Sequence, residues 1–173
     1  MTRFTFSSRS RTRAQFVDPA LMGVAEDALA ISAVDFGFTE DQSRTKAEQQ
    51  RKFDTGVSKV RPGPKARHMI QADGYSKAID AVPFVDGKFQ WGDPQWRIKT
   101  ASGAVIEPFY EIAAAMREAA IKRGVRVRWG AVWDRVLNDL PAGAAAMKAA
   151  VEAYKVRHVG ADFLDGPHFE IVQ

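Results

Sequence analysis

Helical and strand-like segments follow one another along this chain without regular alternation. Residue spacing and capping signals predict helices at residues 18–32, 45–54, 107–123 and 142–157. Short alternating stretches predict strands at residues 34–38, 78–84, 125–129 and 168–172. Because a parallel α/β sheet needs strands that alternate regularly with helices, this order favours an α+β fold.

Two long stretches are not predicted to form regular elements. Residues 56–74 contain Pro62, Gly63 and Pro64 with several basic residues, which predicts a loop over the surface. Residues 85–103 fit neither the helical nor the strand period, and Pro83 predicts an abrupt end to the strand before them. The sequence contains neither an internal repeat nor a low-complexity tail. We therefore expect a single domain over residues 1–173.

The composition excludes several kinds of chemistry. The chain contains no cysteine, so disulfides, thiolate zinc sites and cysteine nucleophiles are ruled out, and any metal must be held by histidine and carboxylate. A net charge of +4 favours binding to polyanions, which include nucleic acid, anionic lipid and bacterial cell wall. No apolar run approaches the roughly 18 residues of a transmembrane helix. The basic N-terminus lacks the apolar stretch of a secretory signal, which predicts synthesis in the cytoplasm.

Two of the three histidines lie near carboxylates at informative distances along the chain. His68 precedes Asp80, and His168 follows Asp165 in the sequence DGPHFE. A zinc hydrolase needs three protein ligands and a further carboxylate that takes a proton from water. These four residues could supply that set, with Asp80 and His168 on predicted strands. The spacing alone also fits partly exposed histidines without a metal, and His158 fits that second interpretation best.

A known family shares the order of many residues in this chain. Its pattern is Ser-x-His-x-x-Gly-x-Ala-x-Asp, followed far downstream by an acidic residue three positions before a final histidine. The matching landmarks are Phe6 to Ser10, Thr39 to Gln49, Ser58-Lys59, Trp129-Gly130, Trp133 and Asp165 to Glu170. The chain thus resembles the VanY-like D-Ala-D-Ala carboxypeptidase and L-alanyl-D-glutamate endopeptidase family, which includes many phage endolysins.

The resemblance implies a fold and a role for each site residue. The fold would be a Hedgehog/DD-peptidase-like single domain with a small antiparallel sheet flanked by helices, without a separate cell-wall-binding domain. His68, Asp80 and His168 would ligate Zn²⁺, and Asp165 would be the general base. Arg44 would steady the substrate or the developing oxyanion. Without the resemblance, Arg44 is equally well interpreted as a solvated charge that pairs with Glu48.

The chain departs from the family pattern at several positions. Ala66 replaces the serine two positions before the first histidine, and Ser76 stands where the motif has glycine. The interval between His68 and the aspartate is five residues longer than in the family, so Asp73 competes with Asp80 as the middle ligand, and the strand context favours Asp80. Val132 replaces an aspartate of the family sequence Trp-Gly-Gly-Asp-Trp.

The implied activity is zinc-dependent hydrolysis of the peptidoglycan stem peptide at the L-Ala–D-Glu bond, for host cell lysis. Two alternatives remain: a D,D-carboxypeptidase that removes terminal D-Ala, and an inactive basic module that binds wall or nucleic acid. The four tryptophans could line a glycopeptide groove or belong to the core. The cations at positions 59, 61, 65 and 67 could draw the enzyme to anionic wall polymers.

The resemblance also implies where and with what the chain acts. Its expected partner is bacterial peptidoglycan, with no nucleic acid and no transmembrane segment. We expect a monomer that is made in the host cytoplasm and acts on the wall after release.

Overall fold

The computed structural model describes residues 4–158 and 163–172. The helices are α1 (Ser8–Arg13), α2 (Pro19–Ile31), α3 (Lys46–Asp54), α4 (Pro108–Arg123) and α5 (Ala144–Arg157), with a 3-10 turn η1 (Leu137–Asp139). The strands are β1 (Phe36–Gly37), β2 (Ala78–Asp80), β3 (Val82–Val85), β4 (Lys88–Phe89), β5 (Ile98–Lys99), β6 (Val105–Ile106), β7 (Val127–Trp129) and β8 (His168–Ile171). None of the helices in these residues combines the length and apolar character that a membrane span requires.

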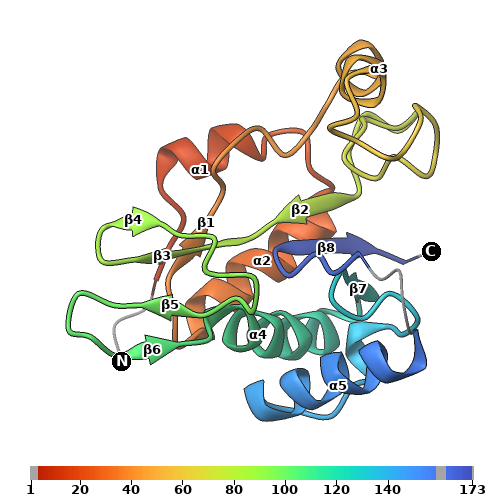
Figure 1. Cartoon of the computed structure of the whole chain (residues 1–173). Coiled ribbons are helices and arrows are strands. Elements are labelled where there is room, and N and C mark those ends of the chain that lie inside the picture. Colours follow the sequence, from red (N-terminus) through yellow and green to blue (C-terminus); the bar gives the residue numbers. More distant parts are fainter. Residues whose placement is uncertain (1–3, 159–162, 173) are drawn as a thin grey trace.

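The strands form small antiparallel sheets, which confirms the predicted α+β fold (Figure 1). The sheet that matters for the site has the order β2-β8-β7, so the last strand of the chain lies between two earlier ones. A second sheet has the order β1-β3-β4, and β5 pairs with β6. The described residues therefore contain three small sheets, where the resemblance implied one.

The stretch 78–84 is divided between two sheets, and this differs from the single strand predicted. β2 pairs with β8, whereas β3 pairs with β1 and β4. Pro83 lies inside β3 and does not end it. Pro83 has no N–H to donate, but pairing continues on both sides of the strand: the Pro83 carbonyl accepts from the Gln90 N–H at 3.0 Å, and the Phe84 N–H donates to the Asp35 carbonyl at 2.8 Å.

Helices α2 and α4 pack against each other and share one hydrophobic core with the site sheet. Asp18 caps α2 by accepting a hydrogen bond from the Ala20 N–H at 2.9 Å. Gly124, with φ of 65°, ends α4 in the left-handed conformation that glycine adopts without strain. The fully buried rings of Trp129 and Phe169 stack across the β7–β8 pair. One face of the sheet β2-β8-β7 is therefore packed against the hydrophobic core.

The four predicted helices are present, with bounds within two residues of those expected at most ends. Helix α1 was not predicted because its six residues are too few to show a period, although Ser7 caps it. The short strands β4 and β5 lie in the stretch that the sequence left unassigned, and β6 follows directly after it. Two-residue strands carry no alternation that a sequence pattern could reveal.

Candidate metal centre and active site

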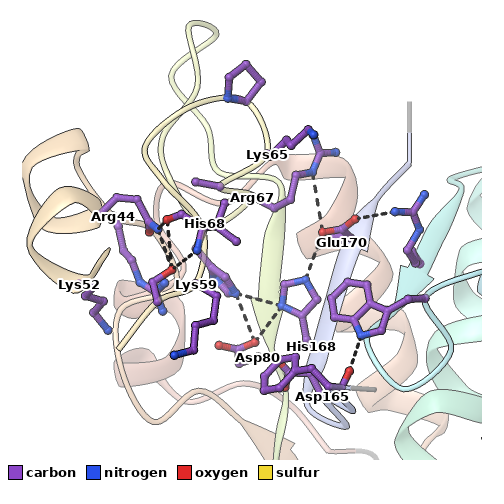
Figure 2. Close-up of a pocket in the computed structure, with 18 of the residues that line it drawn as sticks. Arg44, Lys52, Lys59, Lys65, Arg67, His68, Asp80, Asp165, His168 and Glu170 are labelled. Carbon is purple, nitrogen blue, oxygen red and sulfur yellow. Dashed lines mark hydrogen bonds and ion pairs between the residues drawn. The ribbon is translucent and has the colours of Figure 1, made fainter. Parts of the chain in front are cut away.

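The β2–β8 pair brings two of the expected metal ligands together. Asp80 lies directly opposite His168 in the register of these strands. His68 reaches them from the end of the preceding loop, where the Arg44 N–H donates to the His68 carbonyl at 2.8 Å. Residues from three separate parts of the sequence thus meet at one place (Figure 2).

The three donor atoms form a nearly equilateral triangle. The Nε2 atom of His68 lies 3.2 Å from Nδ1 of His168, and each nitrogen lies 3.3 Å from Oδ1 of Asp80. Zinc in a tetrahedral site, with bonds of about 2.0 to 2.1 Å, separates its ligand atoms by about 3.3 Å. The triangle therefore has the size of one face of a zinc tetrahedron, with the fourth corner free for water or substrate.

Hydrogen bonds on the far side of each ring fix which nitrogen faces this triangle. Nδ1 of His68 lies 2.9 Å from the Gln42 carbonyl, so it carries the proton and leaves Nε2 with its lone pair toward the cluster. Nε2 of His168 lies 3.2 Å from Oε2 of Glu170, which leaves Nδ1 as the ligand atom. A histidine oriented by a carbonyl or a carboxylate in this way is typical of metal sites.

Gln42 contacts two of the expected ligands, and the sequence analysis did not single it out. Its side chain is almost fully buried, with 1% exposed. The backbone carbonyl of Gln42 accepts from Nδ1 of His68, and the side-chain Oε1 atom of Gln42 accepts a hydrogen bond from the Asp80 N–H at 2.5 Å. One residue thus supports two ligands. These partners lie 26 and 38 residues away, so no local pattern could have indicated them.

Glu170 also escaped the sequence analysis as a site residue. It accepts from His168 and forms ion pairs with Arg128 at 3.4 Å and Arg67 at 4.0 Å. A signal did exist, because positions two apart on a strand face the same side and Glu170 follows His168 by two. The Glu170 carboxylate therefore links Arg67 and Arg128 to the imidazole of His168.

The cluster stabilises positive charge at the triangle. Burial alone would lower the pKa of His168, but hydrogen bonds to Asp80 and Glu170 outweigh it and raise that pKa to about 9. Burial alone would raise the pKa of Asp80, yet the charge of His68 and the hydrogen bond from His168 hold it well below its usual range. A buried place that favours a cation suits a metal ion.

Asp165 lies in the same cleft but outside the triangle of donor atoms. Its N–H donates to the Gly130 carbonyl at 2.9 Å, and its own carbonyl accepts from the His168 N–H at 3.2 Å. Burial raises the pKa of the Asp165 carboxyl, which makes it a better proton acceptor than an exposed aspartate. This position and chemistry suit a general base beside a metal site.

Two glycines allow the turn that carries Asp165 to come close to the sheet. A Cβ atom on Gly130 would lie 2.6 Å from the Asp165 carbonyl oxygen and 3.0 Å from the His168 Cβ. A Cβ atom on Gly166 would lie 2.8 Å from the Trp96 ring. The buried Trp129 Nε1–H donates to the Gly166 carbonyl at 2.7 Å. A side chain at Gly130 would therefore displace Asp165 and His168, and one at Gly166 would displace the Trp96 ring.

Arg44 lines the cleft, with 16% of its side chain exposed. Its guanidinium lies 3.8 Å from Glu40, and its Nε atom is buried without a hydrogen-bond partner among the described residues. The pairing with Glu48 considered from the sequence is wrong, because Glu48 instead completes a capping box with Thr45 at the start of α3. Arg44 thus retains donors for a substrate.

Asp73, the competing middle ligand, lies away from the cluster. Its carboxylate forms an ion pair with Lys77, and 54% of its side chain is exposed. The geometry therefore favours Asp80.

The departures from the family pattern are accommodated locally: Ser76 hydrogen-bonds Ser43 at 2.7 Å, and Val132 is buried in the core. Ala66 is buried and lines the cleft.

The four tryptophans and His158 differ in whether they line the cleft, belong to the core or lie elsewhere on the surface. Trp133 lines the cleft, with its ring centroid 5.3 Å from that of His168. Trp129 belongs to the core, and Trp96 packs against it. Trp91 is exposed and does not line the cleft. His158 pairs with Asp134 at 3.2 Å, outside the metal-ligand group.

The cleft above the cluster has a volume of about 890 Å³, enough for a short peptide. One side is formed by β2 and β8, and the other by α3 and the loop of residues 57–67 that follows it. Figure 2 shows His68, Asp80 and His168 close together, with the labelled cations around them.

Three comparisons with known proteins identify the family of this chain. Residues 1–139 match the family described as phage L-alanyl-D-glutamate peptidase. The L-alanyl-D-glutamate peptidase of Escherichia phage T5 is 28% identical over 131 residues, which cover 76% of this chain and 82% of that protein. The crystal structure of Serratia marcescens L-Ala D-Glu endopeptidase ChiX has a TM-score of 0.63 at 25% identity, and the match covers 98% of this chain and 91% of that one.

Proposed function

The chain belongs to the phage L-alanyl-D-glutamate peptidase family, and we propose that it is a zinc-dependent endopeptidase that cleaves the L-Ala–D-Glu bond of bacterial peptidoglycan. The observation that carries the zinc proposal is the triangle of His68, Asp80 and His168 donor atoms, with sides of 3.2 to 3.3 Å. A carboxylate that is not a ligand lies in the same cleft. Together they make a hydrolase site.

The residues present fit zinc rather than a harder cation. Two imidazole nitrogens and one carboxylate are a donor set that zinc hydrolases use, whereas calcium and magnesium prefer oxygen ligands throughout. His68 and His168 would bind through Nε2 and Nδ1, and Asp80 through Oδ1. When bound, zinc lowers the pKa of water to about 7 and polarises the carbonyl under attack.

Asp165 would carry the protons of the reaction. Its carboxylate accepts a proton as the water oxygen attacks the L-Ala carbonyl carbon. It then delivers that proton to the departing amine of D-Glu, while the C–N bond breaks. The products are a carboxylate on L-Ala and a free amine on D-Glu. The raised pKa of Asp165 supports this role, because a catalytic base works best when its pKa approaches the working pH.

Arg44 would stabilise the oxygen on which negative charge develops. Its side chain lines the cleft and has a buried Nε atom without a partner among the described residues. A guanidinium held there can donate to the developing oxyanion without rearrangement.

We place this activity on the bacterial cell wall, after release of the protein from the host cytoplasm in which it is made. A monomer without a nucleic-acid partner is consistent with the proposal. The cationic cleft supports an anionic wall substrate, because opposite charge accelerates encounter.

Mass analysis of digested wall fragments tests the proposed bond. Zinc-loaded protein should release fragments that begin with D-Glu and leave L-Ala with a free carboxyl group. Loss of a single terminal alanine would instead identify a D,D-carboxypeptidase. Binding to wall without any cleavage, with or without zinc, would identify an inactive binding module.

A further inference from the structure

The cations that line the cleft form two groups around the ligands. Figure 2 shows Arg44, Lys52 and Lys59 on the side of α3, and Lys65 and Arg67 on the side of Glu170. We call the first group, Arg44, Lys52 and Lys59, the α3 wall.

The group beside Glu170 already has an anionic partner. Arg67 and Arg128 both pair with the Glu170 carboxylate, which also accepts from His168. The charge of Arg67 is therefore committed to the carboxylate that accepts from His168, whereas Lys65 forms no ion pair within residues 4–158 and 163–172.

The α3 wall has an excess of positive charge that faces the cleft. Arg44 and Lys52 share one carboxylate, Glu40, at 3.8 and 3.6 Å, which are longer than hydrogen bonds. Glu40 is 55% exposed and is not among the lining residues. Lys59 forms no ion pair with any residue within 4–158 and 163–172. On this side of the cleft, three cations thus share one carboxylate, Glu40, which pairs with two of them.

The backbone around Lys59 is held in place, unlike that of an ordinary surface loop. Gln49 of α3 is buried, and its Nε2 donates to Ser58 Oγ at 2.9 Å and to the Val60 carbonyl at 2.7 Å. The Ser58 N–H donates to the Lys52 carbonyl at 2.8 Å. Both neighbours of Lys59 are therefore fixed to the helix that carries Lys52, so the wall is preorganised.

The chemistry of the substrate supplies a matching anion. In an L-Ala–D-Glu peptide the glutamate uses its amino group in the scissile bond and one carboxyl group to continue the chain. Its other carboxyl group remains, either as a free carboxylate or as an amide. The L-Ala side of the bond is neutral. The only charge next to the scissile bond is therefore on the glutamate.

We infer that the α3 wall binds the free carboxylate of D-Glu, and that Lys59 determines specificity against stem peptides in which this carboxyl group is amidated. The inference rests on the proposed function and adds to it the charge state of the substrate. Amidation removes the anion that the three cations attract, and places an amide dipole against ammonium and guanidinium donors.

Two synthetic substrates test the inference. One is N-acetyl-L-alanyl-D-glutamyl-L-lysine joined through the γ-carboxyl group, and the other is identical except that its α-carboxyl group is an amide. Zinc-loaded wild-type protein should show a kcat/KM about tenfold higher for the carboxylate, since a charged hydrogen bond contributes about 1.5 to 3 kcal/mol. Lys59→Gln should reduce this preference to about threefold or less, chiefly by lowering kcat/KM for the carboxylate substrate. Lys59→Arg should restore most of it.

Lys88→Gln is the matched control, because Lys88 is an exposed lysine on β4 outside the cleft lining. It should retain the full preference. Equal rates on both substrates by the wild-type protein would overturn the inference and leave the proposed function intact. A preference that Lys59→Gln and Lys88→Gln alter equally would also overturn it. Failure to cleave either peptide at the L-Ala–D-Glu bond would overturn the proposed function itself.

Discussion

The two sides of the cleft are built by different means. On the sheet side, β2 and β8 pair residue by residue, His168 and Glu170 are buried, and their polar atoms are hydrogen-bonded. On the α3 side, Gln49 is the one buried residue of the helix, and exposed cations surround it. Two of the three expected ligands, Asp80 and His168, thus rest on paired strands, whereas His68 and the cations that would recognise charge rest on the α3 side.

Among the changes considered, replacing Asp80 with alanine should cause the largest loss of zinc binding and activity. The variant should lose stoichiometric zinc and all hydrolysis, because only two imidazoles remain. Asp73→Ala is the matched control and should retain both, since Asp73 pairs with Lys77 away from the cluster. Metal analysis and wall lysis of the two variants measure the difference. Zinc loss in Asp73→Ala with retention in Asp80→Ala would reverse the assignment.

The metal-free protein should lose stability as the pH rises from about 6.5 to about 9. His168 has a pKa raised to about 9 in the folded protein, so its protonated form stabilises the fold below the unfolded pKa of 6.5. That contribution disappears as the pH rises through the folded pKa and amounts to at most about 3 kcal/mol. Zinc should remove this dependence because it replaces the proton. Urea unfolding across this pH range, with and without zinc, measures the effect.

Glu170→Ala should weaken zinc binding by about 10 to 100-fold, the usual effect of removing a residue that orients a metal ligand. Glu170→Gln should be milder because its carbonyl oxygen can still accept from His168. Titration with a competing chelator measures both affinities. Equal losses in the two variants would show that the charge of Glu170, and not the orientation of His168, is what matters.

Gln49→Ala should have the smallest effect on zinc binding and on the rate of hydrolysis. It should separate the role of the α3 side from that of the sheet side. The loss of two hydrogen bonds should cost about 1 to 2 kcal/mol of stability. Zinc affinity should remain unchanged, while the preference for the D-Glu carboxylate should fall as Lys59 loses its fixed position. Reduced zinc binding in this variant would mean that the two sides are coupled.

The sequence predicted the helices, but it did not predict the contacts that support the expected site residues. Caps and apolar spacing located α2 and α4, and alternation located β8. The roles assigned to His68, Asp80, His168 and Asp165 came from the family resemblance, and they remain predictions until metal and activity are measured.

The supports of the site escaped because they are contacts between distant positions. Gln42 meets its partners across 26 and 38 residues, and the requirement for glycine at position 130 arises only where the Asp165 turn approaches β7. The division of residues 78–84 between two sheets likewise depends on which strands pair, since both halves share the same local pattern.

The central claim is that one metal held by three residues works with a separate base. The most direct test measures zinc per chain and the rate of L-Ala–D-Glu cleavage for wild type, His168→Ala and Asp165→Asn side by side. The account predicts one zinc in the wild type, none in His168→Ala, and full zinc with at least about a hundredfold loss of rate in Asp165→Asn. Loss of zinc from Asp165→Asn, or cleavage by His168→Ala at the wild-type rate, would contradict it.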